Sequence, residues 1–142
     1  MGVCSTAYNM AFEKSVLKHL AEEFPDLSGQ LMDIHDNMCD LMVPFQKQYY
    51  YSKAMQGSYS IKYVLPALWP GDPELDYHNL PVVHNLEGVH NGAEASVSYA
   101  DMVNHTPEEI AEMRENLLKY CGLDTYAMVK VLNRLKEIAD MK

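Results

Sequence analysis

Two short stretches of the chain combine residue types that together can hydrolyse a phosphodiester. Tyr120 and Asp124 are four positions apart, so on a helix they share one face and place a phenol hydroxyl beside a carboxylate. Such a carboxylate can hold a divalent metal ion, while the phenol orients the attacking water. The structural alternative is that Asp124 caps the last helix and Tyr120 packs at the surface.

The second stretch lies near the N-terminus, where a short strand is expected to end in Asn9 and a helix to begin. Glu13 then falls in the first helical turn, where the helix dipole favours a carboxylate and where the side chain can face a metal ion. The simpler alternative is that Asn9 is the N-cap and Glu13 an ordinary first-turn acid.

A third feature is the uneven placement of charge. Residues 41–71 contain no acidic residue, and three lysines, Lys47, Lys53 and Lys62, lie there among aromatic residues that include Tyr59. Aromatic rings stack on bases and lysines neutralise phosphates, so this pattern is typical of single-stranded nucleic-acid binding. The alternative is that the tyrosines pack on the domain with their hydroxyls at the surface, because the segment has no arginine and no recognised binding motif.

Helices are expected to position these residues. Residues 3–8 suit a short strand, and apolar residues spaced by four from Phe12 predict a helix that Pro25 ends. A second apolar stripe, from Leu27 to Leu41, predicts another helix that ends before Pro44.

The C-terminal half follows the same logic. A short helix is expected over 61–68, an irregular connection over 70–92, and a helix over 93–103. Thr106 and Glu109 form a capping-box pattern that starts the next helix, which is expected to break near Gly122 before a last helix from Ala127. The chain is therefore predicted to be mainly α with one or two short strands.

Composition bounds the class of protein. The 142 residues are 48% hydrophobic, which suits one domain over 1–142, and the net charge of −9 opposes a simple electrostatic nucleic-acid binder. The sequence contains no apolar run long enough to span a membrane and no signal-peptide pattern. Three widely spaced cysteines fit reduced thiols, so a cytoplasmic location without membrane attachment is expected.

The first two stretches together resemble the DEDD-type 3'-to-5' exonucleases of the ribonuclease-H-like superfamily, in their tyrosine branch. Asn9-Met10-Ala11-Phe12-Glu13 is similar to the family's Asn-x-x-Phe-Asp motif, with glutamate in the aspartate position, and Tyr120 and Asp124 match its Tyr-x-x-x-Asp motif. Longer runs such as Gly-Ser-Tyr-Ser-Ile-Lys-Tyr-Val-Leu-Pro look like an uncharacterised bacterial domain family found at the C-terminal end of larger predicted nucleases. The resemblance implies a partial ribonuclease-H-like α/β fold that lacks its N-terminal strands.

The resemblance also implies a mechanism. Two Mg²⁺ or Mn²⁺ ions would be held by four carboxylates, with Glu13 and Asp124 among the ligands and Tyr120 orienting water. The substrate would be a single-stranded DNA or RNA 3' end, contacted by Asn9. The charge and aromatic pattern described above adds Lys47, Lys53, Lys62 and Tyr59 as expected contacts. The family's Asp-x-Glu motif is missing, since Asp72-Pro73-Glu74 carries a proline that makes a poor strand. The chain alone is therefore expected to be inactive, with weak or no metal binding.

Two functions from different classes follow. In the first, the chain is the C-terminal portion of an exonuclease domain. In the second, it is a non-catalytic helical interaction module that keeps the framework without the chemistry. In either case, helical faces that the missing sheet leaves uncovered are expected to favour self-association.

Overall fold

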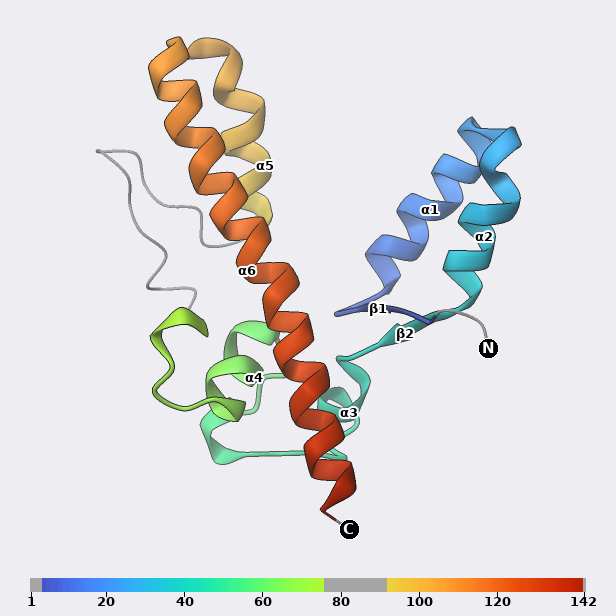
Figure 1. Ribbon diagram of the computed structural model, residues 1–142, viewed down its shortest axis with the longest axis vertical. Helices are drawn as coiled ribbons and strands as arrows, with labels where there is room; N and C mark the ends of the chain where they lie inside the picture. Colours follow the sequence, from blue (N-terminus) through green and yellow to red (C-terminus); the bar gives the residue numbers. More distant parts are fainter. Residues whose placement is uncertain (1–3, 76–91, 142) are drawn as a thin grey trace.

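The computed structural model describes residues 4–75 and 92–141, and this part of the chain is mainly helical (Figure 1). Strands β1 (Ser5–Ala7) and β2 (Met38–Asp40) pair in parallel, with Ser5 opposite Met38. Helices α1 (Ala11–Glu23) and α2 (Ser28–Asp36) connect them and pack against each other. The expected fold class, mainly α with one or two short strands, is confirmed for the described residues.

The second predicted helix extends too far at its C-terminal end. It was expected to reach Leu41, but α2 ends at Asp36, and the side-chain amide of Asn37 donates to the backbone oxygen of Asp33 at 2.9 Å. The next residues form β2, because Met38 to Asp40 gain backbone hydrogen bonds by pairing with β1. Spacing along the chain could not reveal a partner strand some thirty residues away.

Helix α3 (Val43–Gln46) and a 3₁₀ turn (Lys53–Met55) lead into α4 (Ile61–Leu68), the short helix expected at these positions. Another 3₁₀ turn covers Pro73–Leu75, and the carboxylate of Asp72 accepts the backbone N–H of Glu74 at 3.1 Å. The prediction that Asp72-Pro73-Glu74 does not form a strand is therefore confirmed. The expected irregular connection lies largely in 76–91, outside the described residues.

Helix α5 (Gly92–Asp101), a 3₁₀ turn (Met102–Asn104) and α6 (Pro107–Asp140) complete the described chain. The capping box is confirmed: Thr106 Oγ1 accepts the N–H of Glu109, and the Glu109 carboxylate accepts the N–H of Thr106 at 2.9 Å. The predicted break at Gly122 is wrong, since α6 is continuous. Tyr120 and Leu123 are both buried on its inner face, so packing on either side of Gly122 outweighs the low helix propensity of glycine.

The hydrophobic core lies where α4 packs against the C-terminal half of α6 (Figure 1). Val64 and Leu65 of α4 and Ala127 and Val131 of α6 are fully buried there. Further buried members come from α3 and the residue after β2, from the 3₁₀ turns, from the end of α4 and from the first half of α6: Leu41, Phe45, Met55, Leu68, Leu75, Tyr120 and Leu123.

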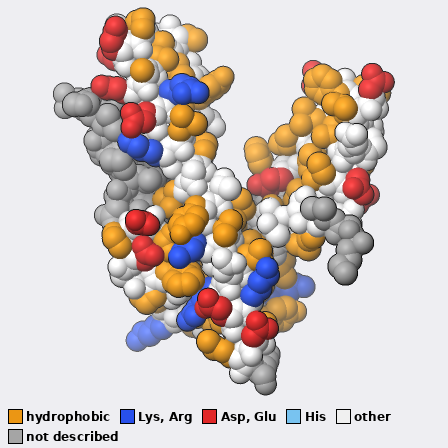
Figure 2. All heavy atoms as spheres, viewed as in Figure 1, with side chains coloured by type: hydrophobic (Ala, Val, Ile, Leu, Met, Phe, Trp, Pro, Cys, Tyr) orange, Lys and Arg blue, Asp and Glu red, His pale blue; other side chains and the backbone are white. Residues whose placement is uncertain are grey.

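The α1–α2 pair stands apart from this core in Figure 1. Its one buried residue among those described is Ala21. Phe12, Val16 and Phe24, from the apolar stripe that predicted α1, are exposed, and Figure 2 shows hydrophobic side chains gathered along this pair of helices. The stripe formed the expected helix, but the described residues do not cover it.

Two further observations concern the cysteines and the length of the helices. Cys4, Cys39 and Cys121 carry free thiols. Within residues 4–75 and 92–141, the helices lack the combination of length and apolar character that crossing a bilayer requires.

Candidate functional site

Tyr120 and Asp124 lie together on α6, as their spacing predicts. Tyr120 is 8% exposed. Its hydroxyl lies close to the start of α5, because a Cβ added to Gly92 would be 4.0 Å from the Tyr120 hydroxyl oxygen. Burial and the nearby charge of Asp124 raise the pKa of Tyr120 to about 12, so the phenol is neutral and keeps its proton at physiological pH. Both structural alternatives are wrong: Tyr120 is buried, and α6 continues through Asp124.

Glu13 lies in the first turn of α1, as expected. The N-cap of this helix is Met10, so Asn9 precedes the cap instead of forming it. One carboxylate oxygen of Glu13 is buried and has no hydrogen-bond partner among the described residues. A buried carboxylate oxygen without a donor is costly, and a divalent cation is one group that would satisfy it.

The described residues do not assemble the full metal centre. Glu13 is on α1 and Asp124 is on α6. In the part of the chain that the structure describes, no three His, Cys, Asp or Glu side chains converge closely enough to hold a metal ion. A two-metal site therefore needs carboxylates beyond those that the described residues bring together.

A pocket of about 660 Å³ brings two other predicted residues together, Asn9 and Tyr59. Its walls come from Tyr8 and Asn9 directly after β1, Met42 after β2, and residues 56–61, which lead into α4. The hydroxyl of Tyr8 donates to the backbone oxygen of Tyr59 at 2.6 Å, which fixes one wall against the other. Burial, followed by the charge of Asp40, raises the pKa of Tyr8, so this donor keeps its proton.

Asp40, at the end of β2, is the residue that sequence reasoning missed. Its carboxylate accepts three backbone N–H groups: those of Asn9 at 2.9 Å, Met10 at 3.1 Å and Met42 at 2.9 Å. It therefore holds the turn from β1 into α1 from across the sheet. Its place directly after Met38-Cys39 would have marked it, had those two residues been recognised as a strand.

The predicted lysines differ in exposure. Lys47, after α3, and Lys53, in the 3₁₀ turn, are exposed, whereas Lys62 on α4 is half-buried. Figure 2 shows several Lys and Arg side chains in the lower part of the molecule as drawn. In the same view, this part contains α4 and the C-terminal half of α6 (Figure 1).

The aromatic residues of this segment also divide into two groups. Tyr50 packs edge-on against Phe45, with ring centroids 5.9 Å apart. Trp69 is covered by cations from α6, with Lys130 Nζ 4.2 Å from the ring centroid. The remaining tyrosines, Tyr49, Tyr51, Tyr59 and Tyr63, are exposed. Packing therefore accounts for some of the rings, and exposed faces suited to stacking remain on the others.

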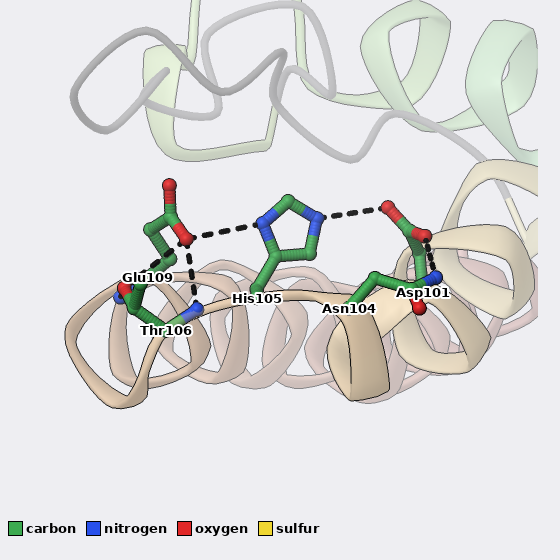
Figure 3. A network of polar contacts seen from close by, with 5 residues as sticks. All are labelled: Asp101, Asn104, His105, Thr106 and Glu109. Atoms are coloured by element: carbon green, nitrogen blue, oxygen red, sulfur yellow. Dashed lines mark hydrogen bonds and ion pairs between the residues drawn. The ribbon is translucent and has the colours of Figure 1, made fainter.

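A polar network joins α5 to α6 (Figure 3). His105 Nε2 lies 2.8 Å from Asp101 Oδ2, and Nδ1 lies 3.3 Å from Glu109 Oε2. The hydrogen bond to Asp101, with support from Glu109, raises the pKa of His105. The two carboxylates lie on opposite ring nitrogens, so they do not converge on one point, and the network fixes the corner between the helices.

Comparison with known proteins gives one match. Residues 1–60 match the family model described as "Domain of unknown function (DUF2779)". No curated protein and no solved structure matches the chain. The DUF2779 match contains Asn9, Glu13, Asp40 and Tyr59, but stops before α4 and does not reach Tyr120 or Asp124. The expected resemblance to an uncharacterised domain family is confirmed for the DUF2779 region, and the exonuclease resemblance stays a prediction.

Proposed function

We propose that this chain is part of a metal-dependent 3'-to-5' exonuclease domain that binds single-stranded DNA or RNA ends and is inactive by itself. The observation that supports it most directly is the buried carboxylate oxygen of Glu13, which has no hydrogen-bond partner among the described residues. Its place in the first turn of α1 is the one that the exonuclease motif requires. The neutral phenol of Tyr120 beside Asp124 supports the same function.

Each residue has a distinct role in this proposal. Glu13 and Asp124 would each offer a carboxylate to Mg²⁺ or Mn²⁺, and the hydroxyl of Tyr120 would orient the attacking water. A bound metal ion would supply Lewis-acid stabilisation of the phosphate oxygens. Because no three His, Cys, Asp or Glu side chains converge among the described residues, additional carboxylates are needed to complete the site, which is why we expect no cleavage by the chain alone.

The experiment uses Mn²⁺ as a paramagnetic probe of the 142-residue chain. We expect Mn²⁺ to broaden backbone amide signals around residue 13, because the ion sits within a few ångströms of them. Glu13→Gln removes a charged ligand at constant size and should abolish the broadening. Glu22→Gln, a surface change on the same helix, is the matched control and should leave it intact.

Cleavage is measured alongside metal binding. The chain alone should release no mononucleotides from a labelled single strand. If mononucleotide release depends on Mn²⁺ and disappears in Asp124→Ala, the chain is active, and the prediction that it is inactive by itself is wrong. Absence of any broadening near residue 13 would overturn the metal role of Glu13.

A second function is favoured by a separate observation. Phe12 is 71% exposed, and Val16 and Phe24 of the same stripe are exposed too, so α1 presents an apolar surface. This suits a non-catalytic interaction module that self-associates through α1. Light scattering well above micromolar concentration should then give a mass above the monomer, reduced by Phe12→Ser but unchanged by Val97→Ser on α5. A strictly monomeric mass would count against this function.

A further inference from the structure

The pocket between Tyr8, Asn9 and residues 56–61 lies where ligands bind in many folds with parallel strands. Tyr8 and Asn9 directly follow β1, and Met42 comes two residues after the end of β2, so the pocket opens at the carboxyl ends of both strands. Ligands of open parallel sheets bind outside these ends, because the loops that follow the strands converge there. The volume of about 660 Å³ falls within the range of small-molecule sites.

The chemistry of the lining is neutral and rich in hydrogen-bonding groups. The described lining has side-chain amides from Asn9 and Gln56 and hydroxyls from Ser58 and Ser60, and none of its described side chains carries a formal charge at neutral pH. Amide and hydroxyl groups suit the edge of a nucleobase and the hydroxyls of a sugar. The exposed ring of Tyr59 adds a face on which a base can stack, whereas the ring of Tyr8 already stacks on Phe45, with centroids 6.5 Å apart.

Charge in the flanking chain suits a phosphate attached to such a nucleoside. Lys53 lies three positions before the wall formed by 56–61 and is exposed. Residues 41–71 contain no acidic residue, so the wall formed by 56–61 does not repel an anion. The Asp40 carboxylate lies behind the opposite wall, where it accepts the N–H groups of Asn9 and Met42, so a phosphate is favoured on the side of 56–61.

The backbone around the pocket is held in an unusual conformation. Asn9 has φ 68° and Gln56 has φ 52°, values that non-glycine residues rarely adopt, and both line the pocket. Asp40 fixes Asn9 through its backbone N–H, and the Tyr8 hydroxyl fixes Tyr59 through its carbonyl. Strain that the surrounding contacts maintain is commonly found at ligand sites.

We propose that this pocket binds one nucleotide, with the base and sugar in the neutral lining and the phosphate toward the exposed Lys53. The nucleotide is either a free nucleoside monophosphate or the last residue of a single strand, since both present the same chemistry. The inference rests on the proposed function for its choice of a nucleic-acid ligand, but it requires neither a metal ion nor cleavage.

The test is titration of the full chain with thymidine monophosphate and with a short oligothymidylate, followed by backbone amide NMR without added metal. Shifts should concentrate at Asn9 and at residues 57–60. Tyr59→Ala removes an exposed ring while leaving the carbonyl that Tyr8 contacts, and should weaken binding about tenfold. Tyr63→Ala is the matched control, because Tyr63 is equally exposed, at 44% against 45%, and is not among the described lining residues.

The two arms separate the sources of the nucleotide. If the oligonucleotide binds more tightly than the monophosphate, and a 3'-phosphate weakens it, the pocket holds a strand end. If the two bind equally, it holds a free monophosphate. The proposed nucleotide site is wrong if the amide shifts do not occur at Asn9 and 57–60. It is also wrong if Tyr59→Ala and Tyr63→Ala weaken binding equally. The exonuclease proposal would survive that result if Mn²⁺ still broadens signals near Glu13.

Discussion

The carboxylate of Asp40 accepts the backbone N–H of Asn9 at 2.9 Å, across 31 positions of the chain. The same carboxylate accepts the N–H groups of Met10 and Met42, so one side chain at the end of β2 supports the start of α1 and the turn toward α3. This contact ties the motif residues Asn9 and Glu13 to the sheet.

Removing this carboxylate should destabilise the fold and disturb the pocket. Asp40→Ala leaves three backbone donors without their acceptor, and we expect a loss of about 2–4 kcal/mol in the free energy of unfolding, measured by urea denaturation. Asp40→Asn keeps one acceptor oxygen and should lose about half as much. Asp36→Ala, at the exposed end of α2, is the control. Equal effects of Asp40→Ala and Asp36→Ala would contradict the role of Asp40.

Gly122→Ala should stabilise the protein by about 0.5–1 kcal/mol. The reason is that α6 is continuous through this position, and a Cβ there meets no atom within 4 Å. Thermal unfolding followed by circular dichroism measures the change. A lower midpoint for Gly122→Ala would indicate a break at this glycine after all.

Two valines on α6 provide a matched test of the core. Val131 is fully buried against α4, whereas Val129, two positions earlier, is 48% exposed. Val131→Ala should cost about 2 kcal/mol, from lost burial and an unfilled cavity. Val129→Ala should change stability by less than about 0.5 kcal/mol. Similar losses for the two variants in chemical denaturation would contradict the packing of α4 on α6.

The His105 network should make stability depend on pH. Because Asp101 and Glu109 raise the pKa of His105 above its ordinary 6.5, its contribution is full below pH 6.5 and is lost as pH rises through the raised value. Hydrogen bonds from Asn104 and from Thr106 lower the pKa values of Asp101 and Glu109, respectively. The stability contributed by each acid is present above its ordinary value, 3.8 for Asp101 and 4.5 for Glu109, and is lost as pH falls through the lowered one.

The network therefore contributes most between about pH 4.5 and 6.5, the ordinary values for Glu109 and His105. Thermal midpoints at pH 5.5 and pH 8.5 should differ less in His105→Gln than in the wild-type protein. His19→Gln, a change at an exposed histidine of α1, should keep the wild-type difference. The same pH response in all three proteins would show that His105 does not carry it.

The sequence by itself determined the local structure, namely where helices begin and end and which side chains share a helix face. Apolar spacing and Pro25 were enough to place α1, and the Thr106–Glu109 capping box was enough to start α6, because both signals act within a few residues. The pairing of Tyr120 with Asp124 followed from helical geometry alone.

Contacts between distant segments were decided by the tertiary structure. Met38 to Asp40 form a strand because β1 offers its edge, and α6 passes Gly122 unbroken because buried residues hold it on both sides. The support of Asn9 by Asp40, the hydrogen bond from Tyr8 to Tyr59 and the pocket that they border each join residues 31 or more positions apart. No pattern of spacing along the chain encodes such contacts, because their energy arises only when the fold brings the partners together.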